Sequence, residues 1–195
     1  MSINVSNVMQ LLHAAKKYQL TSLVKRCVIF LDNELEHSNA CSILEHCRFF
    51  GENDLAKKCL EKIEQNTEVA LASEKFMTIS KETLGIILES NKLRMNEIDI
   101  FRRTYEWASK RTEEMQSVRD TLGDNIYRIR FPIMNANEFN VDVCPTNVLN
   151  ERKQLQIFKY ITNPEISPKP HAFCCEPRLP VKTKGNFKFR IIRYS

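Results

Sequence analysis

The chain has 195 residues, with 29 Lys or Arg against 24 Asp or Glu and 43% apolar residues. This length suits one medium domain with extensions, and the composition is that of a protein with a packed core. No segment approaches the roughly 20 apolar residues that cross a bilayer, and the first residues lack the basic and then apolar order of a secretory signal. We therefore expect neither a membrane partner nor secretion.

Proline and charge divide the chain near residue 163. All seven prolines follow residue 131, and five of them lie between residues 164 and 180. Because proline interrupts helix interiors, the long proline-free part predicts an all-α body. Seven Lys or Arg and two Glu lie between residues 165 and 195, so the formal net charge of +5 belongs to this tail. We expect an extended, poorly packed, proline-rich C-terminal tail.

Four helices are predicted in the first third of the chain. Apolar residues recur at three- and four-residue steps over about residues 8–15, 20–35, 40–50 and 55–63, the pattern of helices that bury one face. Gly51 suits the end of the third of these helices. Because the connections are short, successive helices should pack as antiparallel neighbours, which makes the fold class all-α, with stacked antiparallel helical hairpins.

The middle of the chain carries further helix starts. Thr67, Ser73 and Ser80 look like caps of two brief turns and of a helix. Asn96 followed by Asp99 resembles a capping box and predicts the start of a longer helix.

Two further apolar stripes complete the helical body. The first predicts a helix over residues 122–129, which Phe131 and Pro132 end. The second predicts a last helix with Leu155, Phe158 and Ile161 on its buried face.

The tail alternates in a different period. Phe187, Phe189 and Ile191 alternate with other side chains in steps of two, which predicts a strand that needs a sheet elsewhere. Basic residues between aromatic ones could also contact phosphates and stack on bases. We interpret the lysines of the tail as residues on the solvent-exposed face of the predicted strand. We therefore expect no nucleic-acid partner.

The seven cysteines favour free thiols, because their number is odd and no signal peptide precedes them. We expect a cytoplasmic or nuclear location. Cys41, His46 and Cys47 point in different directions on one helix, so they cannot share a metal ion. The group at residues 171–175 has a His and two Cys but lacks paired C-x-x-C spacing and a fourth ligand. We predict no metal and no cofactor.

Catalytic motifs are missing from the sequence. It contains no Gly-rich phosphate loop, no nucleophile elbow and no His-Glu-x-x-His run. Glu113 and Glu114 are interpreted as a solvated helix end, and His13 as a surface residue or a satisfied core residue. We expect no catalytic residue and no enzyme.

Several segments in a fixed order resemble a known family. Residues 7–18 followed by 23–31 look like the last helices of a BTB/POZ domain. The segments placed like the hallmarks of a BACK domain are 39–44, 73–76, 107–108 and 129–132. The chain is thus similar to BTB–BACK–PHR proteins over about residues 3–163. This resemblance implies BTB helices at 1–36, a BACK domain at 37–163 with a "3-box" helix pair at about 38–65, and a basic tail at 164–195 with the first strand of a missing PHR domain.

The resemblance also implies a function. Such proteins are substrate adaptors of cullin-3 RING ubiquitin ligases in ubiquitin-dependent protein degradation, so the implied partners are cullin-3 and an unknown substrate protein. The alternative is a truncated or orphan helical scaffold without cullin binding.

The partner site implied by the resemblance is an apolar groove in the 3-box, where the N-terminal extension of the cullin would bind. Its candidate residues are Ile43, Leu44, Cys47, Phe50 and Leu55. Recognition of a helix or strand needs an apolar cleft between helices. The sequence does not separate such a groove from a buried core at these positions.

Overall fold

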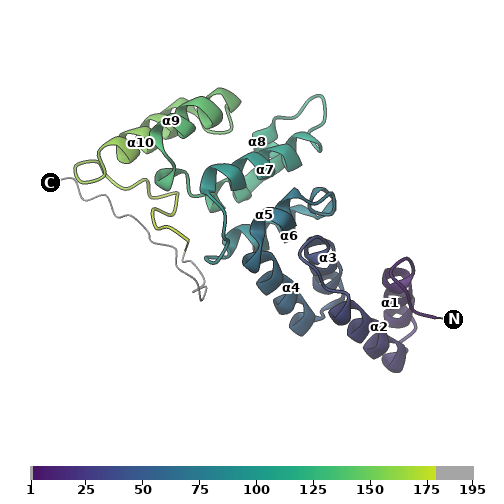
Figure 1. Ribbon diagram of the computed structural model, residues 1–195. Coiled ribbons are helices and arrows are strands. Elements are labelled where there is room, and N and C mark those ends of the chain that lie inside the picture. The colour runs from purple at the N-terminus through teal and green to yellow at the C-terminus, as the bar shows by residue number, and fades with distance from the viewer. Residues whose placement is uncertain (1, 179–195) are drawn as a thin grey trace.

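The computed structural model describes residues 2–178, and the regular secondary structure of this part of the chain consists of helices, without a β-strand (Figure 1). The α-helices are α1 (Val8–Lys17), α2 (Thr21–Asn33), α3 (Ala40–Phe50), α4 (Asn53–Gln65), α5 (Thr67–Ala72), α6 (Lys81–Glu89), α7 (Glu97–Ser109), α8 (Val118–Leu122), α9 (Ala136–Glu138) and α10 (Glu151–Thr162). Tighter or wider turns lie between them, namely η1 (Phe76–Thr78), η2 (Gly123–Arg128), η3 (Phe131–Ile133), η4 (Phe139–Val143) and η5 (Cys144–Thr146).

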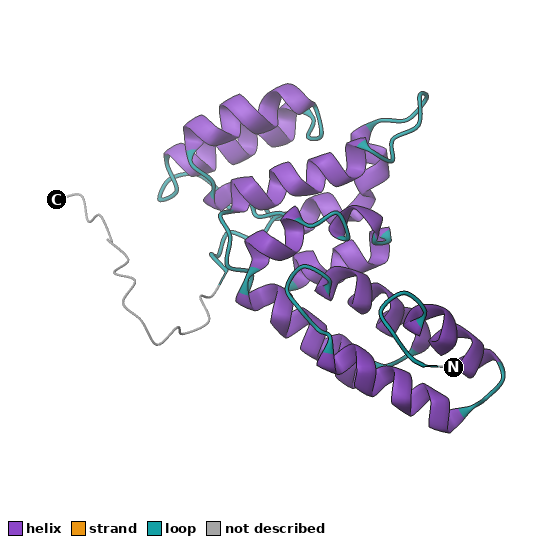
Figure 2. Ribbon diagram, turned by 45° about the vertical axis from the view of Figure 1, so that its right-hand side comes forward, coloured by secondary structure: helices purple, strands orange, loops and turns teal. Residues whose placement is uncertain are grey.

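Successive helices form hairpins, which confirms the predicted fold class. Helix α1 packs on α2, α3 packs on α4, and α3 also contacts α5 and α6. Figures 1 and 2 show the α1–α2 hairpin at one end of the molecule and α9 with α10 at the other. The α1–α2 hairpin contacts the rest of the described chain through α3 and through the ion pair between Asp32 of α2 and Lys58 of α4.

Local signals position several helix ends as predicted, although Asn66 rather than Thr67 caps α5. Gly51 ends α3 with φ of 72°, the left-handed conformation that glycine adopts without strain. The Ser80 hydroxyl accepts a hydrogen bond from the Thr83 amide at 3.2 Å and caps α6. Helix α7 begins after Asn96, but the Asn96 side chain makes no capping bond, so the capping box predicted there does not form. The Asp99 carboxylate instead contacts Arg102.

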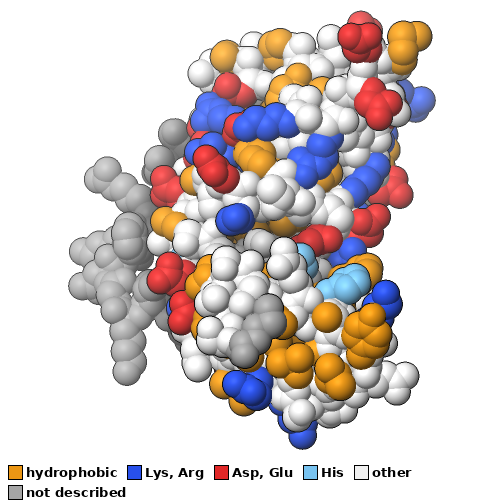
Figure 3. All heavy atoms as spheres, turned by 90° about the vertical axis from the view of Figure 1, so that its right-hand side faces the viewer, with side chains coloured by type: hydrophobic (Ala, Val, Ile, Leu, Met, Phe, Trp, Pro, Cys, Tyr) orange, Lys and Arg blue, Asp and Glu red, His pale blue; other side chains and the backbone are white. Residues whose placement is uncertain are grey.

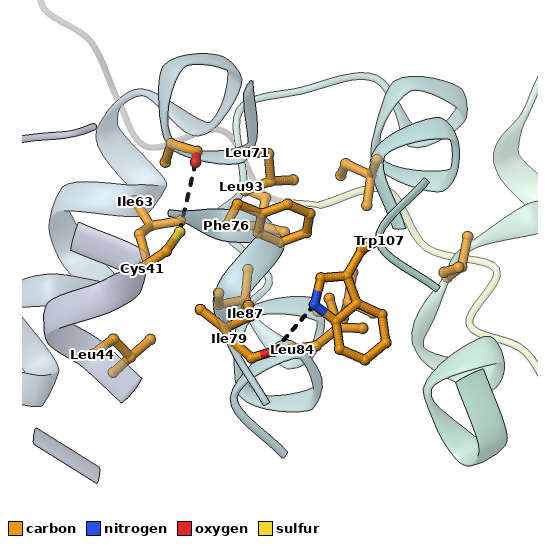
Figure 4. Close-up of a cluster of buried hydrophobic side chains, with 14 of the residues drawn as sticks. Cys41, Leu44, Ile63, Leu71, Phe76, Ile79, Leu84, Ile87, Leu93 and Trp107 are labelled. Carbon is orange, nitrogen blue, oxygen red and sulfur yellow. Dashed lines mark hydrogen bonds between the residues drawn. The ribbon is translucent and has the colours of Figure 1, made fainter. Parts of the chain in front are cut away.

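The core runs through all the hairpins and includes several aromatic rings. The indole Nε1 of Trp107 donates to the carbonyl of Ile79 at 3.1 Å, which satisfies its polar atom inside the core (Figure 4). The Cys41 thiol lies 3.7 Å from the carbonyl of Ala70, and burial raises its pKa to about 12. All seven cysteines are free thiols. Cys41 therefore behaves as an unreactive core residue.

The predicted helix over residues 122–129 is wrong in kind. Helix α8 ends at Leu122, and the backbone of Gly123 turns to φ of 54°. The chain continues as the tighter turn η2, and Leu122, Ile126 and Ile129 are still buried. Glycine at positive φ separates the two pieces, which an apolar stripe alone does not reveal.

The predicted inner face of the last helix is wrong at two of its three residues, since Ile161 alone packs on the core. Leu155 is 55% exposed and Phe158 37% exposed, whereas Ile157 is fully buried. The amide of Gln154 faces the body as well and donates to the carbonyls of Cys144 and Leu149 at 3.2 and 2.8 Å. A polar residue thus occupies the inner face of α10. A prediction based on the apolar positions alone therefore assigns the wrong face of this helix to the core.

The first half of the tail packs on the helical body rather than extending from it. We call residues 164–178 the strap. Phe173 is 7% exposed, and its ring lies 5.5 Å from that of Tyr127 and 5.6 Å from that of Phe131. This corrects the expectation of a poorly packed tail, because the proline pattern does not show that the strap carries buried side chains. The strand predicted at residues 187–192 lies outside the described residues.

A buried ion pair holds the end of the strap. The Arg178 guanidinium donates from Nη2 and Nε to the Glu97 carboxylate at 2.7 and 3.0 Å. It also donates to the carbonyl oxygens of Leu88 at 2.8 Å and Arg128 at 3.2 Å, and to that of Ser90. Both charged side chains are nearly inaccessible, at 3% and 4% exposure. The strap therefore joins the end of α6, the start of α7 and the end of η2.

Candidate partner-binding groove

Most of the predicted site residues belong to the core. The buried ones are Ile43, Leu44, Cys47 and Leu55. They lie where α3 and α4 pack on each other and, through α3, on α5 and α6. Phe50 differs, because it is only partly buried and stands at the open end of α3. Only Phe50 of the five is available to a partner in this structure.

Phe50 lines a hollow between α1 and α3, which we call the α1–α3 groove. Its volume is about 480 Å³, within the roughly 300–1,000 Å³ usual for ligand pockets. The residues that line it are Met9, Gln10, His13, Ala14, Lys17, Tyr18, His46 and Phe50. Figure 3 shows apolar side chains gathered beside histidine side chains on one face of the molecule. The groove can therefore accept an apolar side chain from another molecule.

Helix periodicity explains how α1 forms one wall of the groove. Val8, Leu12 and Ala15 point into the core. Met9 and Lys17 stand on a different row of the helix, eight residues apart, and this row faces the groove. One short helix thus serves the core with one face and the groove with another.

Aromatic contacts shape the open end of the groove. The His13 ring meets the Phe50 ring edge to face, with centroids 5.7 Å apart and an interplanar angle of 82°. Phe49 packs on Phe50 at 5.0 Å and is itself 73% exposed. Edge-to-face pairs stabilise the arrangement of rings in addition to the area they bury. A partner would meet two adjacent phenyl rings at this point.

A polar clamp fixes Phe50 relative to α1. The Lys16 ammonium donates to the Phe50 carbonyl at 3.1 Å and also pairs with the Glu52 carboxylate. Because Phe50 is the last residue of α3, this clamp satisfies one of the carbonyls that have no partner within the helix. The two walls of the groove are therefore tied together at one end.

His46 lies on the α3 wall rather than in open solvent. Burial lowers the pKa of its imidazole, and the neighbouring Glu45 carboxylate partly opposes that shift. Glu45 itself faces away from the groove, since its carboxylate accepts hydrogen bonds from the amide and hydroxyl of Ser80. The imidazole of His46 is therefore a partly buried part of the groove wall.

Sequence reasoning missed the α1 side of the groove. A signal was present, because Met9, His13 and Lys17 follow one another at four-residue steps beside the core stripe. That row contains an apolar, an aromatic and a basic residue, so a search for apolar helix faces does not identify it. His13 in particular is exposed and packs on Phe50 rather than being a core residue.

The remaining described surface offers no metal centre. No group of three or more His, Cys, Asp or Glu side chains within residues 2–178 is placed to hold a metal ion. In the same part of the chain, every helix is too short or too polar to traverse a bilayer. A larger hollow of about 1340 Å³ beside α7 is lined by arginines and acids, of which Arg102 and Arg103 are paired with carboxylates.

Comparison with known proteins points to one family. Residues 40–143 match the family described as BACK, "BTB And C-terminal Kelch". Over 166 residues, 82% of the chain, the sequence is 34% identical to BTB/POZ domain-containing protein 6-B of Danio rerio and 33% identical to BTB/POZ domain-containing protein 6 of Homo sapiens. Over 161 residues, 80% of the chain, it is 34% identical to BTB/POZ domain-containing protein 3 of Homo sapiens. The matches cover 34%, 31% and 31% of those proteins, so the chain spans about a third of the length of the curated relatives it matches.

Proposed function

The chain belongs to the BACK family, and on that premise we propose that it is a non-enzymatic protein-interaction module that links a substrate protein to a cullin-3 ubiquitin ligase. The observation that carries the proposal is the α1–α3 groove, which presents an apolar floor and Phe50 to solvent. Adaptors act by holding two proteins together, so an uncovered apolar cleft between helices is the feature such a module needs.

We propose that the N-terminal extension of cullin-3 binds in this groove. Phe50 would be the central contact, and Phe49 would extend it at the rim, since aromatic side chains are enriched among the residues that dominate binding energy. The four buried residues, Ile43, Leu44, Cys47 and Leu55, would support the groove from below without touching the partner.

Pull-down of the purified chain with cullin-3, with and without the N-terminal extension, tests the proposal. We expect binding that requires the extension. Phe50→Asp should reduce cullin-3 affinity about tenfold or more, because the carboxylate would have to be buried in an apolar site. Ala14→Arg provides a second variant, since it fills the groove from the α1 wall and leaves the core untouched.

Leu155→Asp is the matched control, because Leu155 is also an exposed apolar residue but lies on α10. Circular dichroism melts establish that each variant is folded. A folded chain that fails to bind cullin-3 would refute the proposal and leave the alternative, a helical scaffold without cullin binding. Unchanged binding by folded Phe50→Asp and Ala14→Arg would place the cullin site elsewhere.

We also propose that the protein acts in the cytoplasm or nucleus. The seven free thiols support this location, because thiols persist in reducing compartments. Imaging of a tagged chain checks it, and accumulation in an oxidising compartment would contradict it.

A further inference from the structure

The α1–α3 groove carries positive charge at Lys17, which forms its basic rim. Of the described residues that line it, none is Asp or Glu, and burial lowers the pKa of the His46 imidazole. Lys17 forms no ion pair within residues 2–178. Its ammonium lies 5.6 Å from the centre of the Tyr18 ring, at the edge of the same groove.

The two glutamates next to groove residues are engaged elsewhere. Glu52 pairs with Lys16, whose ammonium also binds the Phe50 carbonyl. Glu45 receives hydrogen bonds from Ser80 at 2.9 and 2.8 Å, on the opposite side of α3. Neither carboxylate therefore neutralises Lys17. The groove lacks a built-in counter-charge for its basic rim.

The apolar floor and the basic rim of the groove lie close enough together for one short peptide to contact both. Met9, Ala14 and Phe50 supply the apolar surface, and the Lys17 ammonium borders it. An apolar side chain seated on Phe50 would bring a neighbouring carboxylate of the same peptide close to the basic rim, where opposite charges attract.

We infer that the α1–α3 groove binds a short segment of a partner protein in which an apolar side chain lies next to an Asp or Glu. This inference rests on the proposed function, since it names the chemistry that the adaptor's groove selects. The size of the groove agrees with this occupant, because about 480 Å³ holds a few side chains rather than a folded domain.

Fluorescence polarisation with three labelled peptides tests the inference on the full chain. The peptides share a Leu-Phe centre and differ only in flanking residues, which are Glu, Gln or Lys. We expect the Glu-flanked peptide to bind about fivefold more tightly than the Gln-flanked one, as for exposed ion pairs. This preference should shrink at high salt, since salt screens exposed charges. Phe50→Asp should abolish binding of the Glu-flanked peptide.

Charge reversal at the rim sharpens the test. Lys17→Glu should reverse the order, so that the Lys-flanked peptide binds more tightly than the Glu-flanked one. Lys25→Glu is the matched control, because Lys25 is an exposed lysine on α2 that does not line the groove. It should leave the order unchanged.

The outcomes separate this inference from the proposed function. Equal affinities for the three peptides, or no binding of any of them, overturn the inference, whether or not cullin-3 is retained. A preference for the Glu-flanked peptide that Lys17→Glu reverses supports the inference. If that preference is found while cullin-3 does not bind, the groove keeps its selectivity and the cullin proposal fails.

Discussion

Replacement of Arg178 by methionine should destabilise the whole helical body, because it removes one partner of a buried ion pair. Methionine keeps much of the aliphatic length and deletes the guanidinium. The Glu97 carboxylate would then remain buried with one backbone donor, the amide of Arg130 at 3.1 Å. Three backbone carbonyls would also lose their contact with Arg178.

The expected magnitude follows from burial. Both charged side chains are at most 4% exposed, so solvent cannot replace the lost partner. Removal of one member of such a pair costs about 3–5 kcal/mol. At roughly 2–4 °C per kcal/mol for a chain of this size, the midpoint of thermal unfolding should fall by about 6–20 °C.

Urea unfolding of the full chain, followed by circular dichroism, measures the loss of stability. Arg102→Met is the matched control, since Arg102 also forms ion pairs but is 51% exposed, and its loss should cost below about 1 kcal/mol. The double variant Arg178→Met with Glu97→Met removes both charges and should recover much of the loss. If Arg178→Met stays within about 0.5 kcal/mol of the parent chain, the ion pair does not form in solution and the docking of the strap is wrong.

Three further predictions concern other parts of the molecule. Limited proteolysis of the native chain should spare the peptide bonds of the strap, and a stable product ending at Asn163 would contradict the packed strap. Gly85→Ala should lower stability by about 1 kcal/mol although alanine favours helix, because the new methyl would lie 2.9 Å from the Asn125 Oδ1; urea unfolding checks this, and a more stable variant would refute it. Burial tends to raise the pKa of Glu45, but hydrogen bonds from Thr83 and Ser80 outweigh it, so the pKa lies below the ordinary value of 4.5. The stabilisation by Glu45 is then complete above pH 4.5 and is lost as the pH falls through the lowered pKa. Glu45→Gln should therefore flatten acid unfolding in that range, and an unchanged acid profile would argue against it.

Sequence reasoning located the helices well where a local signal marks their ends. Gly51 ends α3 because its backbone adopts positive φ, and this requirement is visible in the sequence itself. The α10 face was wrong because Gln154 occupies the inner side through hydrogen bonds to distant carbonyls. Such bonds depend on neighbouring elements, so no helical period predicts them.

The groove could be predicted only in part for the same reason. Ile43, Cys47 and Phe50 share one apolar stripe of α3, and the stripe alone does not show where cover by other helices stops. Phe50 is not fully covered, because α1 lies beside it with Met9 and His13 on the face that lines the groove. That boundary is a property of packing between two hairpins, which a single helix pattern does not contain.

The strap has a consequence for the order in which the chain folds. Arg178 contacts residues 50, 81 and 90 positions earlier in the sequence, so its partners must be assembled before it can bind. Contacts of such long separation form only after the entropy of closing the intervening loop has been lost. Docking of the strap should therefore be a late event, and the first large opening of the native state should be its release. In a chain whose strap has not yet docked, Glu97 and Phe131 would be exposed to solvent. Exposure of these two side chains would therefore distinguish this partly folded state from the native state.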